Sequence, residues 1–361
     1  MAGKAPALKT AAQAETFFNR LVKRRRHLRK WARRTGAGAY RLYDRDIPEI
    51  PLVLDWYGEA ETGPPGADSS GAAAGALYKR PYEKDPAEEE QWLAAMKDAA
   101  ARALNLEPER IFLRERARKT AGRAQYGRIA EKGVLKTVRE RGLLYRVNLS
   151  DYLDTGLFLD RRLFRARIGE EAAGRRVLNL FCYTAALSVA AAAGGAAGVD
   201  SVDLSNTYLN WGRENCALNG LEAAPPGTPA GAAPLTLIRA DVLRFVDEAA
   251  GRRSRWDLII LDPPAFSNSK KARRDFDLKR DHPALIEKCL RLLAPRGVLY
   301  LSANVKGFKL TAEPPRADIT AEDITEQLRD EDFRGKRVPA AWRIMKNEGN
   351  YSTPVFAGRR S

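Results

Sequence analysis

The sequence predicts an α/β protein in which an open parallel sheet, with helices on both faces, follows a smaller basic α+β domain. Strand-like segments alternate with helix-like segments after about residue 150, and parallel strands require helical crossovers of this kind. The length of 361 residues exceeds one ordinary domain and suggests two. We expect a flexible tail over 1–14, the basic domain over 15–149, the sheet domain over 150–346 and a second tail over 347–361.

A cationic helix is predicted from Glu15 to Arg34, with a stop at Gly36. Apolar residues recur in it at three-, four- and seven-residue intervals, which is the spacing of one buried helix face. The other face is cationic and carries no carboxylate; its residues are Arg20, Lys23, Arg24, Arg25, Arg26, Arg29, Lys30, Arg33 and Arg34. Such a face binds RNA phosphates or is merely solvated, and a second basic stretch over 110–146 favours RNA.

The rest of the basic domain is predicted to contain strands and one further helix. The strands are expected at 47–57, 77–82, 111–115, 134–138 and 143–149. A loop rich in Gly, Ala, Pro and Ser separates the first two, and we expect it to be mobile over 58–76. Asp85 followed by Pro86 starts the helix, because a capping carboxylate and a proline suit its first turn, and the helix ends near Leu104.

In the sheet domain, five strands are expected, and a helix follows each of the first four. The strands are predicted at 175–182, 198–204, 235–240, 256–262 and 296–302, and the helices at 185–193, 206–219, 241–249 and 283–293. Ligands of such sheets bind at the carboxyl ends of the strands. The residues at those ends are therefore the candidate site.

Carboxylates and aromatic residues occupy the strand ends where a dinucleotide enzyme would carry GxGxxG. The first strand ends in Asn179-Leu-Phe-Cys-Tyr-Thr, without a glycine-rich phosphate cradle. Asp203 ends the second strand, where a carboxylate can accept both ribose hydroxyls of a nucleoside. Asp241 follows the third strand and Asp262-Pro-Pro the fourth. This set favours a cationic nucleoside such as S-adenosylmethionine over NAD, although Asp203 and Asp241 could instead be helix caps and Asp-Pro-Pro a stiff turn.

Charge and composition point to nucleic acid and argue against several other classes. Lys and Arg number 62 against 46 Asp and Glu, a net charge of +16. The three cysteines are far apart and there are two histidines, so neither a disulfide framework nor a zinc site is expected. We expect no metal, no membrane partner and a cytoplasmic location. The uncharged run from Val177 to Val199 is long enough to span a bilayer, but its polar residues and its change of period argue against that.

Several segments together resemble one enzyme family, the guanine-N7 methyltransferase half of the bifunctional bacterial 23S ribosomal RNA methyltransferase. They are TGLFLDRR (155–162), LNLFCYTA (178–185), SVDLSNTYLNWGRENCALNGL (201–221), LDPPAFSNSK (261–270), RDHPALI (280–286) and SANVKGF (302–308). The resemblance spans about residues 15–346 and includes the basic helix. Two features depart from the family: no second methyltransferase or upstream RNA-binding module is expected in this chain, and Ser302-Ala303-Asn304 replaces Ser-Asn-Asn.

This resemblance implies a Rossmann-like class I methyltransferase fold that uses S-adenosylmethionine, with an N-terminal RNA-binding domain. Carried over residue by residue, the first wall of the cofactor site is Asn179, Phe181, Tyr183 and Thr184. By the same resemblance Asp203 holds the ribose, Asp241 the adenine amine, and Asp160 and Arg162 lie near the methionine end. The implied partner is 23S ribosomal RNA or a large-subunit assembly intermediate.

The residue types at the site favour guanine N7 over other methyl acceptors. Methylation of pyrimidine C5 requires a thiolate, and neither Asp262-Pro-Pro-Ala nor Ser302-Ala-Asn-Val contains a cysteine. Cys182 is more simply a small core residue. Amine methylation usually uses an aromatic residue after Asp-Pro-Pro, where this chain has Ala265. N7 has an in-plane lone pair and no proton, so it needs positioning more than acid/base catalysis.

In this interpretation a few side chains hold the guanine and the flanking phosphates. Asp262 also belongs to the cofactor site, and with Asn268 it orients the base. Phe266 stacks on the base, Asn304 shapes the pocket, and Lys270 and Lys271 contact flanking phosphates. Two alternatives remain open: methylation of another atom such as guanine N2, and a noncatalytic RNA-binding factor for ribosome assembly.

Overall fold

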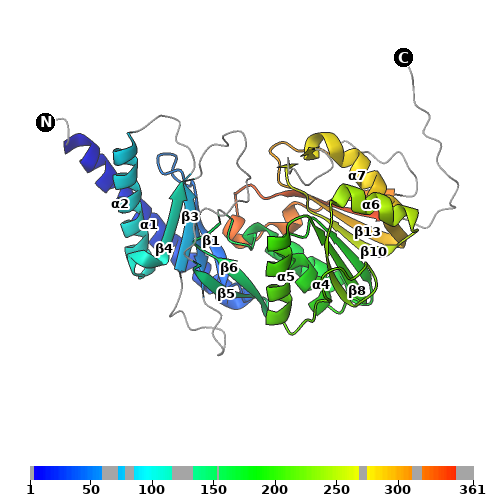
Figure 1. The fold of residues 1–361 in the computed structure, drawn as a ribbon. Helices are drawn as coiled ribbons and strands as arrows, with labels where there is room; N and C mark the ends of the chain where they lie inside the picture. The colour runs from blue at the N-terminus through cyan, green and yellow to red at the C-terminus, as the bar shows by residue number, and fades with distance from the viewer. Residues whose placement is uncertain are drawn as a thin grey trace, which may run out of the picture.

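The N-terminal part of the protein is a four-stranded sheet with two helices on one face (Figure 1). The structure is a computed structural model that describes residues 4–58, 72–77, 85–115, 133–152, 154–267, 275–310 and 319–346. The sheet contains β1 (Ala39–Asp44), β2 (Leu52–Tyr57), β3 (Ala72–Leu77) and β4 (Ile111–Glu115) in that order. β1 to β3 are antiparallel in turn, and β4 is parallel to β3.

Helices α1 (Lys4–Thr35) and α2 (Pro86–Leu104) cover this sheet with one apolar core. Phe17, Leu21 and Leu28 of α1 are fully buried in it, at the spacing that predicted the helix. The Asp85 cap is confirmed, because its Oδ1 accepts from the backbone N–H of Ala87 at 2.9 Å.

Two expectations about this part are wrong. Residues 4–14, expected in a flexible tail, form the first turns of α1, because this alanine-rich stretch favours helix and docks on α2. Gln13 Oε1 accepts from Trp92 Nε1 at 2.7 Å, and Ala14 is buried. In addition, β3 begins inside the loop expected over 58–76, where Ala72 to Leu77 pair with β2. Residues 78–82 of the strand expected at 77–82 lie outside the described residues.

The C-terminal part contains a seven-stranded sheet, and five of its strands are the parallel strands that the alternation predicted. Its order is β14-β15-β13-β10-β7-β8-β9. The parallel strands are β7 (Arg176–Leu180), β8 (Gly198–Asp203), β9 (Leu235–Arg239), β10 (Trp256–Leu261) and β13 (Leu293–Ala303). The chain builds β7, β8 and β9 outward and then places β10 on the other side of β7. The strand order therefore reverses between β7 and β10, and ligands of such sheets bind at the carboxyl ends of the strands where this happens.

Helices cover both faces of this sheet. Alternate residues of the buried strands face opposite sides: Leu258 and Ile260 belong to one core cluster, and Ile259 and Leu261 to another. The first cluster includes α3 (Arg162–Glu171), α4 (Ala186–Ala193) and α5 (Asn206–Leu218). The second includes α6 (Val242–Gly251) and α7 (Leu278–Leu292).

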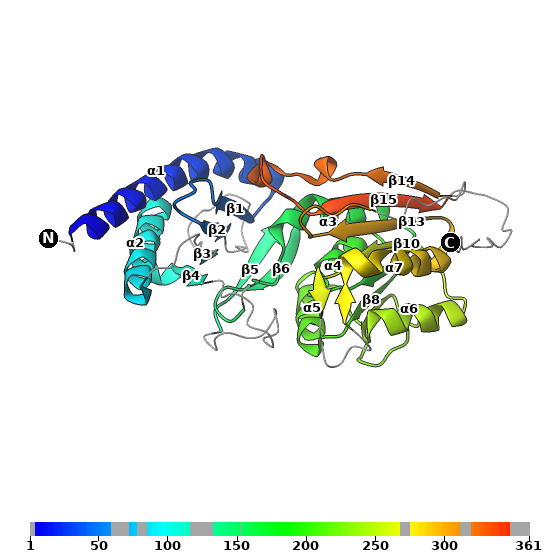
Figure 2. The same cartoon turned by 90° about the horizontal axis from the view of Figure 1, so that it is seen from above.

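Two antiparallel strands that the sequence did not predict complete the sheet. β15 (Ala340–Lys346) pairs with β13, and β14 (Ile319–Asp323) pairs with β15 on the outside. The residues between them, 324–339, form a strap that reaches the N-terminal part. Lys336 Nζ donates to the carbonyl of Asp44 at 2.7 Å, and the backbone N–H of Arg41 donates to Asp332 Oδ2 at 3.0 Å. From above, the strap lies against the C-terminal half of α1 (Figure 2).

A hairpin lies between the two parts. It consists of β5 (Leu135–Glu140) and β6 (Leu143–Asn148), which were predicted within a few residues. Val138 and Tyr145 of this hairpin share a core cluster with Tyr57 of the N-terminal sheet and Phe164 of α3. Apolar packing is therefore continuous from one part to the other. Among the described residues, no helix is long and apolar enough to cross a membrane.

Candidate active site

The turn after β7 is the most strained backbone at the carboxyl edge of the sheet. Phe181, Tyr183 and Ala185 have φ of 59°, 52° and 56°, a left-handed backbone conformation that residues other than glycine seldom adopt. Asp203 Oδ2 accepts from the backbone N–H of Tyr183 at 2.9 Å and holds this turn from β8. Strain of this kind persists where surrounding structure enforces it and gathers at functional sites.

The carboxylate of Asp203 is buried, and its hydrogen bonds do not fully offset the cost of burying its charge. Its Oδ1 accepts from the backbone N–H of Ser205 at 2.8 Å, and burial raises the pKa of Asp203 to about 6. A carboxylate in that state gains from further donors, and two ribose hydroxyls would supply them. The capping alternative is wrong for Asp203, because Ser205 is the N-cap of α5.

Asp241 follows the other alternative. It is the N-cap of α6, and its Oδ1 accepts from the backbone N–H of Arg244 at 3.0 Å. The helix-cap interpretation is therefore confirmed for Asp241. A capping carboxylate keeps further lone pairs, so the adenine contact expected for Asp241 stays a prediction.

Aromatic rings spread to both sides of the strained turn. The Tyr183 ring lies between those of Phe158 and Tyr208, with centroid distances of 5.1 and 4.4 Å. The Phe181 ring lies 5.6 Å from that of Phe276, on the β11–β12 hairpin (Phe266–Ser267 and Phe276–Asp277) that follows β10. Phe181 and Tyr183 thus lie at the turn where the resemblance implies a cofactor wall, Phe181 beside the hairpin after β10 and Tyr183 beside α5, which follows β8. Their contact with the cofactor stays a prediction.

Asn179 and Thr184 point into the protein. Both side chains are fully buried. Asn179 Nδ2 donates to Ser188 Oγ at 2.8 Å, and Thr184 Oγ1 donates to the carbonyl of Gly156 at 2.6 Å. Both side chains are therefore directed into the protein, where Asn179 Oδ1 is buried without a hydrogen-bond partner. The cofactor contact expected of Asn179 and Thr184 stays a prediction.

Gly156 is held where no side chain fits. Its φ is 93°, and a Cβ built on it would lie 2.2 Å from Cζ2 of Trp211. The loop that carries Gly156 therefore rests directly on the indole ring. This close approach positions the carbonyl that Thr184 contacts.

Arg162 also needs correction, because it does not reach the carboxyl edge. Its guanidinium is fully buried, donates to Asp330 and Asp332 at 2.9 Å each, and donates to the carbonyl of Ala39 at 2.6 Å. With Nε 3.5 Å from Glu140, each nitrogen faces a protein acceptor. Arg162 therefore joins the strap to the N-terminal sheet, and its guanidinium is buried away from the carboxyl edge.

The neighbouring Arg161, which the sequence did not single out, is the arginine at the site. Its Nη2 and Nε donate to the two carboxylate oxygens of Asp262 at 2.8 and 3.0 Å. Arg161 Nη1 also lies 3.4 Å from Asp160 Oδ1. Asp160 and Asp262 are therefore brought together by one guanidinium, and the orientation of Asp262 is fixed by a bidentate pair.

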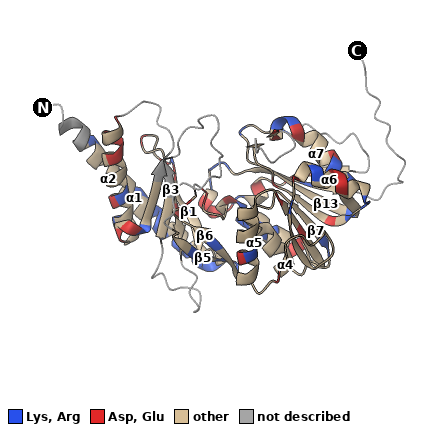
Figure 3. Cartoon of the chain, viewed as in Figure 1, with Lys and Arg blue, Asp and Glu red and all other residues tan. Residues whose placement is uncertain are grey.

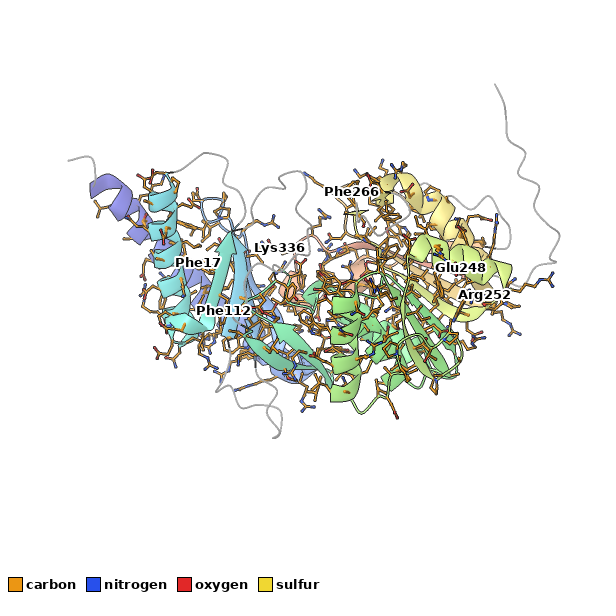
Figure 4. All side chains as sticks on the ribbon, in the orientation of Figure 1. Phe17, Phe112, Glu248, Arg252, Phe266 and Lys336 are labelled. Carbon is orange, nitrogen blue, oxygen red and sulfur yellow. The ribbon has the colours of Figure 1, made fainter. Side chains whose placement is uncertain are left out.

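The remaining expected base contacts are only partly described. Phe266 has an exposed side chain, 39% accessible, on β11 just after Asp262 (Figure 4). Asn304 is exposed at the end of β13, and its Oδ1 accepts from Arg337 Nη2 at 3.1 Å. Asn268, Lys270 and Lys271 lie outside the described residues.

The Lys and Arg residues of α1, blue in Figure 3, divide into two sets by their exposure and contacts. Arg20 pairs with Asp46 at 2.6 Å, Arg24 donates to the carbonyl of Asp332 at 3.3 Å, and Arg25 lies 5.2 Å over the Trp56 ring. Arg29 is half-buried. The exposed cations are Lys23, Arg26, Lys30, Arg33 and Arg34, and we call them the α1 stripe. Arg20, Arg24 and Arg25 thus have structural contacts that the sequence could not show.

Neither cysteine nor histidine provides reactive chemistry at this edge. All three cysteines are buried, and burial raises the pKa of the Cys182 thiol well above its ordinary value. His282 Nδ1 lies 2.9 Å from the carbonyl of Leu278 inside α7, as expected for a structural residue. Within the described ranges, no group of three His, Cys, Asp or Glu side chains is placed to hold a metal ion.

The fold and the strand-end residues define a class of enzyme. The chain belongs to the S-adenosylmethionine-dependent methyltransferases, whose family model matches residues 76–311. A structure described as a methyltransferase complexed with SAH is 24% identical, covers 92% of this chain and 81% of its own, and has a TM-score of 0.68. That likeness shows the fold, and the expected Rossmann-like methyltransferase fold is confirmed.

Within that class, the chain is similar to enzymes of one kind. It is 40% identical over 341 residues to ribosomal RNA large subunit methyltransferase K of Neisseria meningitidis, covering 93% of this chain and 89% of that protein. It is 43% identical over 333 residues to ribosomal RNA large subunit methyltransferase K/L of Pseudomonas putida, covering 92% of this chain. The chain spans 42% of the length of that K/L relative.

Proposed function

We propose that this chain transfers a methyl group from S-adenosylmethionine to guanine N7 of 23S ribosomal RNA, without a covalent enzyme intermediate. The likeness to large-subunit ribosomal RNA methyltransferases over most of the chain supports the substrate class. The observation that carries the N7 assignment is an exposed Phe266 side chain four residues after Asp262, in a protein whose cysteines are all buried.

The residues at the strand ends suit the cofactor. Asp203 would accept the ribose hydroxyls, Asp241 would accept the adenine amine, and the Tyr183 wall would pack against the nucleoside. Asp160, paired with Arg161, is placed to meet the cationic methionine end. S-adenosylmethionine, when bound, supplies an electrophilic methyl group on a sulfonium.

Asp262 and Phe266 would position the guanine. Both Asp262 oxygens already accept from Arg161, yet each keeps a second lone pair for the N–H groups of the base. Stacking on Phe266 would fix the plane of the ring, and Asn268 and Asn304 would complete the pocket. The N7 lone pair then forms a bond to the methyl carbon as the carbon–sulfur bond breaks. No proton has to leave, so no general base is needed.

The α1 stripe would hold the RNA backbone. Its five cations face solvent, while base selection is left to the pocket, and this division between phosphate and base contacts is usual in nucleic-acid recognition. We place the reaction in the cytoplasm, where ribosomal RNA is found. Lys270 and Lys271 remain proposed phosphate contacts.

The test is the chemical identity of the product. Unmodified 23S RNA incubated with the protein and S-adenosylmethionine should yield 7-methylguanosine in nucleoside mass spectrometry. The charged ring should make the site cleavable by borohydride followed by aniline. Recovery of N2-methylguanosine or a methylated pyrimidine would replace the N7 assignment. Cofactor binding without turnover on RNA would instead favour a noncatalytic assembly factor.

A further inference from the structure

The geometry points to a second RNA-binding element, the strap segment 331–337, which extends the α1 stripe to the carboxyl edge of the sheet. The cations that would contact phosphates are Arg334 and Arg337 on this segment and Lys306 and Lys309 beyond it. This inference rests on the proposed function, because it takes RNA as the substrate. It adds Arg334, Arg337 and Lys309, which no sequence motif singled out.

The path begins on the exposed side of α1. At 3.6 residues per turn, Lys23, Arg26, Lys30, Arg33 and Arg34 fall within an arc of about 120°. That arc lies opposite the buried residues Phe17, Leu21 and Leu28. From Lys23 to Arg34 the helix rises about 16 Å, which makes the stripe a row of charges along one side of the helix.

The strap lies at the border of the α1 stripe. His27 lies at the edge of the same arc, and its Nε2 is 2.8 Å from Glu331 Oε1. Arg24, which lies outside the arc, donates to the carbonyl of Asp332. Arg334 Nη1 is 3.7 Å from that same Glu331 oxygen, with 78% of its side chain exposed. Glu331 thus joins α1 to Arg334, and Arg334 continues the row of exposed cations from the helix onto the strap.

The other end of the segment reaches the proposed base pocket. Arg337 is exposed and donates to Asn304 Oδ1 at 3.1 Å. Lys306 and Lys309 are exposed on the turn that follows Asn304. Lys336 points the other way, to Asp44 and Asp46, and anchors the segment on the N-terminal part. The segment is therefore tied at both ends while its arginines face solvent.

This arrangement fits a phosphodiester backbone. Phosphates along one strand follow a continuous line, and exposed cations from α1, through Arg334 and Arg337, to Lys306 and Lys309 supply a matching line. The line ends beside Asn304, at the edge where Asp203 and Asp262 also lie. An RNA strand bound along it would deliver a neighbouring nucleotide to the pocket.

The test compares paired variants for binding to unmodified 23S RNA transcript across a potassium chloride series. The strap variant is Arg334→Gln/Arg337→Gln, and the helix variant is Lys23→Gln/Lys30→Gln. The control is Arg244→Gln/Arg252→Gln, which removes the same charge from exposed arginines of α6 and its C-cap, at the far end of the C-terminal part from Lys336 (Figure 4). Far-UV circular dichroism and affinity for S-adenosylmethionine check that each variant is folded.

Loss of two phosphate contacts should lower the slope of log affinity against log salt by about 1.4 to 1.8 and weaken binding about 10- to 30-fold near 0.1 M salt. The control should keep the wild-type slope. Photo-cross-linking of the wild-type complex should attach RNA to peptides containing Arg334 and Arg337.

Each other outcome overturns a distinct statement. If the strap variant matches the control, or no cross-link falls on the strap, the path is refuted, while a reduced slope in the helix variant would leave the RNA substrate standing. If the wild-type protein binds the transcript without salt dependence and forms no methylated product, the proposed function itself fails.

Discussion

Replacing Arg162 with methionine should strongly destabilise the protein without touching the proposed site. Arg162 lies fully buried among Asp330, Asp332 and Glu140, and its guanidinium carbon is 5.0 Å over the Trp31 ring. Methionine retains a chain of similar length but leaves Asp332 with the backbone N–H of Arg41 as a remaining donor. Breaking a buried ion pair by removing one partner costs about 3 to 5 kcal/mol.

The pH dependence of the stability loss distinguishes a broken ion pair from a simple packing defect in the Arg162→Met variant. Burial raises the pKa of the Asp332 carboxyl above its ordinary value even with Arg162 present, and loss of Arg162 should raise it further. A carboxyl whose folded pKa lies above its unfolded pKa lowers stability as pH rises through the folded value. The Arg162→Met variant should therefore be less destabilised at pH 5 than at pH 8.

Urea unfolding followed by tryptophan fluorescence and circular dichroism measures the effect, since Trp31 reports directly on the Arg162 contact. The double variant Arg162→Met/Asp332→Asn should recover more than half of the lost free energy at pH 8, because it removes the stranded charge. A loss below about 1 kcal/mol in the single variant, or no recovery in the double, would refute the ion-pair argument.

Three further predictions follow from the site. Affinity for S-adenosylmethionine should fall as pH drops through about 6, where Asp203 gains a proton; calorimetry should find this dependence absent in Asp203→Asn, and Asp203→Ala should lose about 1 to 3 kcal/mol. Gly156→Ala should lower the melting temperature well beyond Gly174→Ala, whose φ of 69° is also positive but whose Cβ would meet nothing within 4 Å; equal shifts would contradict the Trp211 clash. Cys182→Ala should keep turnover within a few-fold on the RNA assay, whereas a trapped RNA adduct through sulfur would disprove the noncovalent reaction.

The parallel sheet could be predicted because its signal is local. From β7 to β13, each buried strand is a short apolar run and each connection is a helix, so chain order and layer follow directly. β14 and β15 could not be found in the same way. Two short 3-10 helices, and no α-helix, separate these two strands, and β14 exposes most of its short length at the edge of the sheet. β15 pairs with β13 and β14 pairs with β15, and the hydrophobic periodicity of a segment does not indicate which strand it pairs with.

The errors at the site came from side-chain direction. Arg161 and Arg162 are neighbours where a helix begins, and adjacent helical residues point about 100° apart. One therefore reaches Asp262 while the other enters the buried cluster around Asp332. For Asn179 the strand alternation did carry a signal, because Leu178 and Leu180 share one core and Asn179 must face the other way.

The same limit applied to the cations of α1. Helical spacing separates the buried Leu21 and Leu28 from the exposed Lys23 and Lys30. Arg24, in contrast, donates to the carbonyl of Asp332 in the strap, which lies 308 residues later in the chain. A contact of that sequence separation leaves no trace in the local pattern.

The strap also determines how the protein can be divided experimentally. A cut near residue 150, where the two sequence domains meet, would leave an N-terminal fragment without Asp332, which accepts from the backbone N–H of Arg41, and without Lys336, which donates to the carbonyl of Asp44. The Tyr57 hydroxyl of that fragment would also lose Thr155 Oγ1, which lies 2.8 Å away. The complementary fragment would carry Arg162 and Phe333 with no surface to bury them. Neither half is a self-contained unit of expression, and swapping the N-terminal part between relatives will require exchanging the strap with it.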